Sequence, residues 1–303
     1  MDANGVRETM RSNSFRTQCS EAEGNPLTKL KKLEAQLGEQ LGGTSVASVV
    51  PEVALVLGSG LGALADAVED ATVVPYDSLD GFPVSTAPGH AGRFVFGTLA
   101  GVPVVVMQGR VHYYEGYPME DVVLPVRLLA RRGVKRFILT NAAGGMQKGM
   151  KPGDLMLITD HISSLIQSPL LGPNIDELGV RFPDMTQVYD LEMQDAIRTA
   201  ARDLGIDLKE GVYIQISGPQ FETPTEIRTY QGMGADATGM STVVEAIALR
   251  HMGARVAGIS CISNLASGLG DSLLTSEDVN ETGAAVAETF TALLKEVVKG
   301  CLS

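Results

Sequence analysis

Short runs of β-branched and aliphatic residues alternate with longer helical patterns along most of this chain, and no other feature restricts its fold as much. The strand-like runs are 53–57, 102–107, 136–140, 155–159, 212–217 and 255–261. The helical patterns are 120–132, 189–204, 224–233, 242–252 and 276–299. Runs this apolar are typical of strands covered by helices on both faces, so we expect an α/β fold with a mostly parallel or mixed sheet.

The alternation continues without a break in composition, which indicates one domain from about residue 26 to residue 303. Leucines at helical spacing over 27–37 predict a surface helix that leads into this domain. The first 25 residues are polar, mixed in charge and without the apolar core of a signal peptide, so we expect a disordered extension. The longest uncharged apolar stretch, 94–107, is interrupted by glycine and proline and is too short to cross a bilayer. It predicts two strands joined by a turn.

Charge and cysteine content exclude several classes of partner and site. The net charge of −12 and the pI of about 4.8 argue against a nucleic-acid backbone or an anionic membrane as the main partner. Cys19, Cys261 and Cys301 are far apart and odd in number, which favours neither a disulfide framework nor a thiolate zinc site. No pair among the four histidines has the spacing of helical metal ligands, so we assign no metal. A reducing, cytoplasmic setting is expected.

Polar motifs follow several strand-like runs, at the strand ends where ligands collect in α/β folds. Gly58-Ser59-Gly60-Leu61-Gly62 follows the first run and could hold an anion with its backbone N–H groups. It also resembles part of a dinucleotide-binding fingerprint, with Asp77 near the position of a ribose-binding acid. Its third glycine comes one residue early, which disfavours that interpretation. An ordinary tight turn is the remaining possibility.

Basic side chains lie near two of these strand ends. Arg110 and His112 flank Val111, so the period-two alternation of a strand directs both side chains the same way if the strand continues. Arginine offers a planar donor fork for phosphate, and histidine can add a donor near neutral pH. His90, on a glycine-containing stretch, adds a second imidazole. A surface arginine, a structural histidine and a plain turn are the alternatives.

Glu222 has no evident role in secondary structure. Thr223, Pro224 and Glu226 form a capping box with proline at the first helical position, and Glu222 precedes them. An ionised carboxylate only accepts hydrogen bonds, so it would select a ring with N–H donors, as guanine and hypoxanthine have. Phe221 beside it could belong to the core or line a base pocket.

Two further polar positions allow either a structural or a binding role. Thr242 and Glu245 have the spacing of a second capping box, so the hydroxyls of Ser241 and Thr242 are ordinary helix-start groups or part of an anion site at the same helix terminus. Asn264 is an amide at the end of a buried strand, where an apolar residue would cost less. It is either a turn residue or a ligand-binding group.

Taken together, these segments resemble the trimeric purine nucleoside phosphorylases over about residues 28–299. The motifs that carry the resemblance occur in order: GSGLG at 58–62, PGHAGR at 88–93, QGRVHYYEGYP at 108–118, TNAAGG at 140–145, RFPDM at 181–185, GPQFET at 218–223, GMST at 239–242 and SN at 263–264. One such match would be weak, whereas the ordered set is specific. The resemblance implies a single α/β domain with a mixed, partly barrel-like sheet flanked by helices.

The resemblance also implies roles for individual residues. Those expected to contact phosphate are Ser59, His90, Arg110, His112, the backbone at Ala142, and Ser241. Those expected to contact the nucleoside are Tyr114, Tyr213 and Met240 at the ribose and Phe221, Glu222 and Asn264 at the purine. Phe182 falls where family members lend a phenylalanine to the neighbouring subunit, so a homotrimer with shared sites is implied.

The implied reaction is the reversible phosphorolysis of inosine, guanosine and their deoxy forms to the free base and a pentose 1-phosphate. Positive charge then develops on the sugar and negative charge on the departing purine, so fixed donors and anions should matter more than a protein nucleophile. We expect Asn264, Glu222 and His112 to be catalytic, with phosphate as a co-substrate and no cofactor. In the family, the asparagine contacts the six-position oxygen and the imidazole-side nitrogen of the leaving ring.

Other functions stay open at this point. Related methylthioadenosine phosphorylases carry aspartate where Asn264 stands and lack the glutamate, so a preference for six-oxopurines is expected here. A xanthosine phosphorylase is a further candidate of the same kind. Outside this class the candidates are a NAD-binding oxidoreductase, which rests only on the first glycine turn, and a non-catalytic nucleoside-binding protein.

One departure from the family pattern concerns the five-prime end of the sugar. The histidine that family members place near the five-prime hydroxyl falls at Ser276. Ser276 could instead cap the last helix. We hypothesise that the site holds the five-prime end loosely and tolerates altered groups there. Discrimination against five-prime-deoxy nucleosides equal to that of a histidine-bearing relative would count against this hypothesis.

Overall fold

The structure, a computed structural model, describes residues 25–87, 89–270 and 273–302. The extension expected over residues 1–25 lies outside these ranges except for Asn25, which caps the first described helix. Within the described residues, the strands are β1 (Val53–Leu57), β2 (Glu69–Pro75), β3 (Arg93–Leu99), β4 (Val102–Gln108), β5 (Arg136–Gly145), β6 (Leu155–Ile162), β7 (Lys209–Gln215), β8 (Ala237–Gly239) and β9 (Arg255–Leu265). All of them belong to one sheet.

Over the described residues, the α-helices match the predicted helical patterns in number and place, with one division. They are α2 (Pro26–Leu41), α3 (Met119–Val122), α4 (Leu124–Arg131), α5 (Leu191–Asp203), α6 (Pro224–Gly232), α7 (Val243–His251) and α8 (Ser276–Gly300), with short 3-10 helices η1 (Gly62–Ala67), η2 (Tyr76–Ser78) and η3 (Tyr113–Glu115). The pattern over 120–132 is divided at Val123, because Pro125 supplies no N–H to continue the turns of α3.

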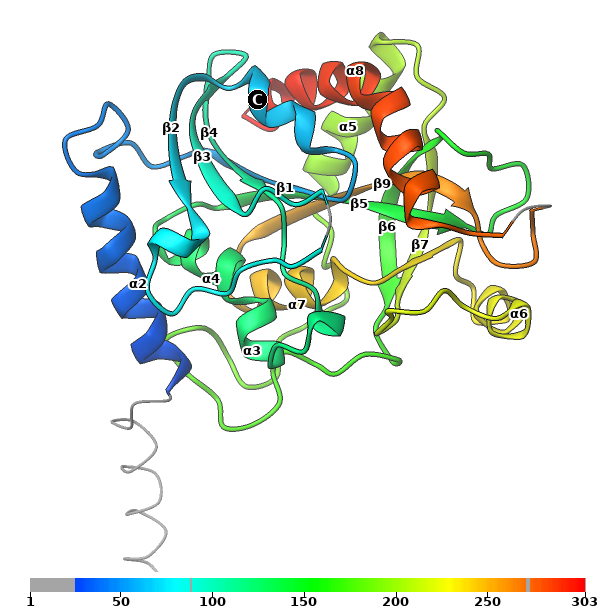
Figure 1. The fold of residues 1–303 in the computed structure, drawn as a ribbon, viewed down its shortest axis with the longest axis horizontal. Helices are drawn as coiled ribbons and strands as arrows, with labels where there is room; N and C mark the ends of the chain where they lie inside the picture. The colour runs from blue at the N-terminus through cyan, green and yellow to red at the C-terminus, as the bar shows by residue number, and fades with distance from the viewer. Residues whose placement is uncertain (1–24, 88, 271–272, 303) are drawn as a thin grey trace, which may run out of the picture.

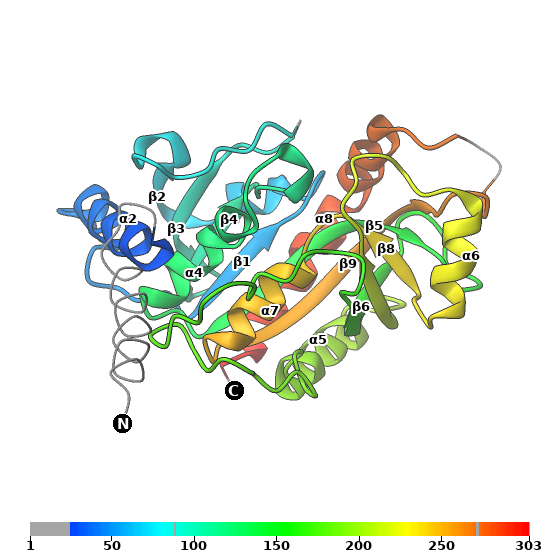
Figure 2. The same cartoon turned by 90° about the horizontal axis from the view of Figure 1, so that it is seen from below.

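Helices cover both faces of the sheet, with α2, α4 and α7 on one face and α5 and α8 on the other (Figure 1, Figure 2). Strand β1 shows why the sequence requires this. All five of its residues are buried, and Ala54 and Val56 belong to one core while Val53, Leu55 and Leu57 belong to the other. Successive side chains of a strand point to opposite faces, so an unbroken apolar run suits a strand covered on both sides.

The sheet is mixed and closes partly on itself. β1 is parallel to β4 and β5, whereas β2, β3 and β4 are antiparallel. β9 pairs with β6 and also with β5, so β5, β8, β7, β6 and β9 form a ring. The predicted α/β fold with a mixed, partly barrel-like sheet is therefore confirmed.

Two strands, β5 and β9, continue into polar motifs beyond their apolar runs. Asn141–Gly145 continue β5, and Ser263 and Asn264 lie inside β9, whereas both segments were expected to follow a strand. β9 has one extra residue, Ser263, and just beyond it Gly144 of β5 pairs with Asn264. On its other side Gly144 pairs with Thr238 of β8. Thr238, Gly144 and Asn264 therefore form a row across the sheet.

The dinucleotide-binding interpretation of the first glycine turn is wrong. In that motif the second strand lies parallel and next to the first, but β2 is antiparallel to β3 at the edge of the sheet, and β3 and β4 separate it from β1. The glycine turn packs instead against α8. A Cβ on Gly283 of α8 would lie 2.7 Å from the Cα of Gly60, so the close approach of the two backbones explains why Gly60 and Gly283 are glycines.

Candidate active site

Arg110 lies at the centre of a polar cluster, although it is only 1% exposed. Its Nη1 donates to the backbone oxygen of Thr140 at 2.6 Å and to Ser241 Oγ at 3.1 Å. Its Nη2 lies 3.0 Å from Glu245 Oε2, in an ion pair whose two side chains are 1% and 3% exposed. Within the described residues, neither Nε nor Nη2 has an acceptor aligned with its N–H. The cluster holds a guanidinium in place and leaves donors for an anion.

His90 connects Ser59 with Arg110. The backbone N–H of Arg110 donates to His90 Nδ1 at 3.0 Å, so the neutral ring carries its proton on Nε2, which lies 3.1 Å from Ser59 Oγ. Burial above all, and then the nearby His112 and Arg110, lowers the pKa of His90 to about 3. His90 is therefore neutral near pH 7 and presents an N–H donor to the cluster.

His112 is held by Glu115, a residue that the sequence analysis missed. Glu115 Oε1 accepts from the backbone N–H of His112 at 2.7 Å and lies 3.1 Å from His112 Nδ1. Burial would raise the pKa of Glu115, but hydrogen bonds from His112 and Thr86 outweigh it and hold that pKa at about 2. The ionised carboxylate only accepts, so His112 Nδ1 carries a proton and Nε2 remains for a ligand. The spacing of three residues between His112 and Glu115 is the signal that could have identified this pair.

The residues expected at the sugar surround this cluster. Tyr114 stacks on His112 with ring centroids 4.8 Å apart. Tyr213 is fully buried, and a Cβ on Gly239 would collide with its hydroxyl, so glycine is needed for the ring to approach. Met240 packs against the first glycine of the GPQFET motif, which brings that motif next to GMST.

Thr242 does not cap α7 through its side chain, so the capping box expected over 242–245 is wrong. Thr242 has φ +84° and ψ −52°, a conformation that β-branched residues rarely adopt. Its hydroxyl accepts from Asn141 Nδ2 at 2.9 Å, and Glu245 pairs with Arg110. Gln215 Oε1 caps the helix instead, accepting from the N–H of the second helical residue at 3.0 Å. Both side chains that local spacing assigned to the cap, Thr242 and Glu245, instead contact residues distant in the sequence.

Glu222 lies outside the capping box of α6, which Thr223 and Glu226 form as predicted. Glu222 is 8% exposed, and its Oε1 accepts from Thr238 Oγ1 at 2.6 Å. No hydrogen bond from another described residue reaches Oε2. Phe221 is 38% exposed, so it lies at the rim rather than in the core. The carboxylate is buried with one oxygen engaged and one available.

Asn264 is oriented by its neighbours in β9. Ser263 Oγ donates to Asn264 Oδ1 at 2.7 Å, and Asn264 Nδ2 donates to the backbone oxygen of Leu265 at 3.0 Å. The second N–H of Nδ2 has no acceptor among the described residues. Residues paired across strands point to the same face of a sheet, so Asn264 and Thr238 lie on one side, about 10 Å apart over two strand spacings. The amide of Asn264 and the hydroxyl that holds the Glu222 carboxylate therefore lie on the same side of the sheet.

The structure thus connects Ser59, His90, Arg110, His112 and Ser241 in one cluster. Ala142 is half-buried on β5, directly after Asn141, which contacts the same cluster through Thr242. The sequence analysis missed the supporting residues Thr140, Asn141, Gln215, Thr238 and Glu245.

Two predicted residues lie outside the cluster. Phe182 is 87% exposed, and the guanidinium carbon of its neighbour Arg181 lies 5.6 Å from its ring centroid. Ser276 is exposed at the start of α8, where its Oγ donates to Glu277. The idea that Ser276 caps α8 is wrong by one residue. Thr275 has the extended backbone that an N-cap needs, and its hydroxyl accepts from the N–H of the third helical residue.

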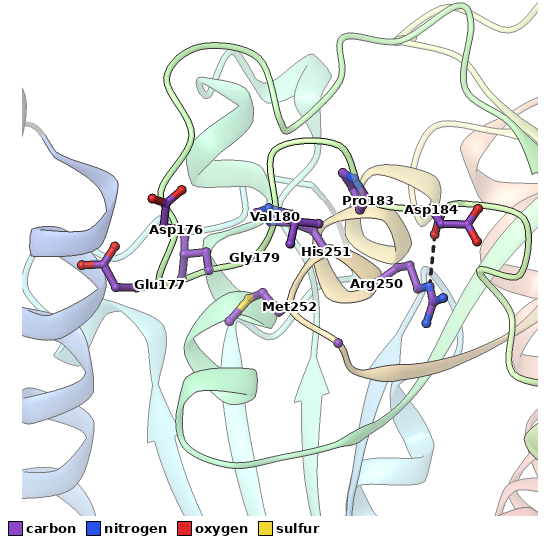
Figure 3. Close-up of a pocket in the computed structure, with 11 residues that line it drawn as sticks. Asp176, Glu177, Gly179, Val180, Pro183, Asp184, Arg250, His251 and Met252 are labelled. Carbon is purple, nitrogen blue, oxygen red and sulfur yellow. Dashed lines mark hydrogen bonds between the residues drawn. The ribbon is translucent and has the colours of Figure 1, made fainter. Parts of the chain in front are cut away.

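A separate pocket of about 440 Å³ lies at the other end of α7 (Figure 3). Its lining comes from the loop 176–184 and from residues 250–253, and Arg250 Nε donates to the backbone oxygen of Asp184 at 3.4 Å. None of the predicted site residues lines this pocket, although Pro183 and Asp184 adjoin Phe182. The residues expected to bind phosphate lie at the opposite, N-terminal end of α7, so this pocket is distinct from the candidate active site.

Two classes of feature are missing from the described part of the chain. None of its helices has the length and apolar character needed to cross a bilayer. Nor do any three histidine, cysteine or acidic side chains in these residues gather as a metal ion would require.

A profile of the phosphorylase superfamily matches residues 52–299. Purine nucleoside phosphorylase 1 of Geobacillus stearothermophilus is 51% identical over 249 residues, which cover 82% of this chain and 91% of the relative. Purine nucleoside phosphorylase of Bos taurus is 47% identical over 219 residues, covering 71% of this chain and 76% of the relative. The crystal structure of Schistosoma mansoni purine nucleoside phosphorylase in complex with inosine has a TM-score of 0.83 at 35% identity, covering 90% of this chain and 96% of that one.

Proposed function

The chain belongs to the phosphorylase superfamily, among its purine nucleoside phosphorylases, and we propose that the cluster around Arg110 binds phosphate while Glu222 and Asn264 hold a six-oxopurine. The protein is a pentosyltransferase that transfers the sugar of a purine nucleoside to phosphate. The observation that carries the assignment of residues is the row Thr238, Gly144 and Asn264. In this row, Thr238, which donates to the Glu222 carboxylate, and the amide of Asn264 lie on one side of the sheet, next to the cluster of cationic and hydroxyl donors.

The phosphate side of the site is built before the ligand arrives. Arg110 is fixed by four partners and still has unaligned N–H groups, and His90 offers Nε2–H beside the Ser59 hydroxyl. Bound phosphate supplies the attacking oxygen, and His112, fixed by Glu115, can exchange a hydrogen bond with it through Nε2. Donors held in this way need little reorganisation as the transition state forms.

The purine side stabilises the leaving group. Glu222 Oε2 would accept from the N–H on the pyrimidine side of a six-oxopurine, and Asn264 Nδ2 would donate to the oxygen at position six. Negative charge spreads onto this oxygen and the imidazole-side nitrogen as the bond to the sugar breaks, so the amide contact strengthens in the transition state. Methylthioadenosine phosphorylase activity is disfavoured, because the six-amino base of methylthioadenosine lacks the ring N–H that Glu222 would bind.

We expect phosphate to be the co-substrate and no cofactor to be needed, because the residues above supply the required donors and acceptor. Xanthosine remains the alternative nucleoside substrate. A cytoplasmic location accords with the two free, buried thiols of Cys261 and Cys301. Ser276 remains our candidate for the loosely held five-prime end, and its side chain is exposed at the start of α8, where its Oγ donates to Glu277.

Release of hypoxanthine from inosine should require phosphate. Without it the attacking group is only a poorly positioned water, and we expect turnover to fall by at least about 100-fold, because orientation of the reacting groups is lost. The measurement is hypoxanthine formation with and without phosphate at constant ionic strength, together with detection of ribose 1-phosphate. Base release that continued unchanged without phosphate would make the protein a hydrolase and contradict the proposal.

A homotrimer with shared sites is the proposed assembly. Phe182 at 87% exposure is joined on the surface by Val180 at 66% and Leu171 at 67%, which is unfavourable unless these side chains are covered. Phe182 would then reach the site of the neighbouring subunit. Light scattering should give a mass three times that of the 32.0 kDa chain, and a fully active monomer would exclude this arrangement.

A further inference from the structure

We propose that Thr238 sets the base preference of this enzyme, because its hydroxyl occupies one of the two carboxylate oxygens of Glu222. The inference rests on the proposed role of Glu222 in binding the purine. It assigns Thr238 as a specificity-determining residue that acts through Glu222, and it accounts for a polar side chain inside a strand that is otherwise suited to apolar residues.

Thr238 is held rigidly and has few alternatives for its hydroxyl. It is the central residue of β8, paired with Ile214 of β7 on one side and with Gly144 of β5 on the other, and it is 2% exposed. Its Oγ1 has one hydrogen-bond partner among the described residues, Glu222 Oε1 at 2.6 Å. A buried hydroxyl without a partner is costly, so the folded protein strongly favours the hydrogen bond from Thr238 to Glu222.

Glu222 depends on this hydroxyl for its orientation. Within the described residues, no cation lies within ion-pair distance of the carboxylate, and Thr238 is its sole side-chain donor. The bond fixes the rotation of the carboxylate about its terminal torsion, which is otherwise soft. Oε1 is thereby engaged within the protein, and Oε2 is the oxygen that remains for a ring N–H.

The two common six-oxopurines make different demands on this carboxylate. Hypoxanthine presents one donor, its ring N–H, and one oriented oxygen suffices. Guanine presents that N–H and an adjacent amino group, which together suit a carboxylate with both oxygens free. When Thr238 engages Oε1, the guanine amino group meets an oxygen that already accepts a short hydrogen bond. The hydroxyl therefore helps inosine through orientation and withholds part of the additional contact that guanosine could make.

The test is the ratio of kcat/KM for inosine to kcat/KM for guanosine in Thr238→Val and Thr238→Ser. Valine keeps the shape and removes the hydroxyl, so we expect the ratio to fall about tenfold, the effect of one hydrogen bond to a charged group. Serine keeps the hydroxyl and should keep the wild-type ratio. The KM for phosphate should change in neither variant, because Arg110 and its partners do not contact Thr238.

An unchanged ratio in Thr238→Val, or an equal loss with both nucleosides, would overturn the proposal, because a purely structural role affects both substrates alike. A second measurement needs no variant. Calorimetry with the unmodified protein should give similar dissociation constants for hypoxanthine and guanine, and guanine binding more than about tenfold tighter would contradict an engaged Oε1. If the unmodified protein cleaved neither nucleoside with phosphate present, the proposed function would fail, and the binding comparison would still decide the role of Thr238.

Discussion

Replacing Asn264 by alanine should lower kcat with inosine by about 10²–10³-fold, the loss that follows removal of one preorganised donor from a developing anion. Asn264 is 9% exposed, and Ser263 and Leu265 fix its amide so that one N–H of Nδ2 is left for the departing base. The contact matters most when charge has moved onto the purine. The change should therefore appear in kcat more than in the KM for the nucleoside, and the KM for phosphate should stay constant.

Asn264→Asp is the matched control for this prediction. It keeps the size of the side chain and replaces the donor by an acceptor, so inosine turnover should remain low although the space stays filled. Thermal unfolding of both variants shows whether the row across the sheet is intact. An unaffected rate in Asn264→Ala would remove the residue from the mechanism, and full activity in Asn264→Asp would show that packing, rather than hydrogen bonding, is what matters.

Replacing Arg110 by methionine should have two effects that a second substitution can separate. The first is loss of phosphate use, with kcat/KM for phosphate falling at least about 100-fold, because no second guanidinium from the described part of the chain joins the cluster. The second is destabilisation by about 3–5 kcal/mol, because Glu245 is left as a buried charge without its partner. The second effect follows from the burial of the ion pair, whose side chains are 1% and 3% exposed.

The double variant Arg110→Met with Glu245→Leu tests this separation. Removing both charges takes away the uncompensated carboxylate, so the free energy of unfolding should largely recover while phosphate use should not. Denaturant unfolding and phosphate saturation curves on the three proteins are the measurements. Recovery of phosphate use in the double variant, or an Arg110→Met protein as stable as the wild type, would contradict the roles assigned to the pair.

Much of the fold could be predicted because its causes are local. The unbroken run over 53–57 requires cover on both faces, and the structure supplies two helical layers. The capping box at Thr223 and Glu226 was identified for the same reason, since its partners are three residues apart. Recognising that Glu222 lies outside this cap was enough to single it out as a residue free for a ligand.

Apart from Glu115, which lies three residues from His112, the residues that sequence reasoning missed depend on partners far along the chain. Glu245 has the spacing of a capping acid, but it pairs with Arg110, and Gln215 takes over the cap. Thr238 has no motif of its own and gains its role only because β8 lies between β7 and β5. Such pairings follow from the order of strands in the sheet, which local patterns do not specify.

The backbone of Thr242 bears on the affinity of the proposed phosphate site. A β-branched residue at φ +84° raises the free energy of the folded chain by about 1–3 kcal/mol, and glycine would relieve this but would lose the hydroxyl that Asn141 contacts. The cost falls on folding, because the protein without ligand already has this conformation. Phosphate bound as proposed would enter a loop whose ordering entropy has already been lost, so its affinity would not be reduced by having to shape the loop.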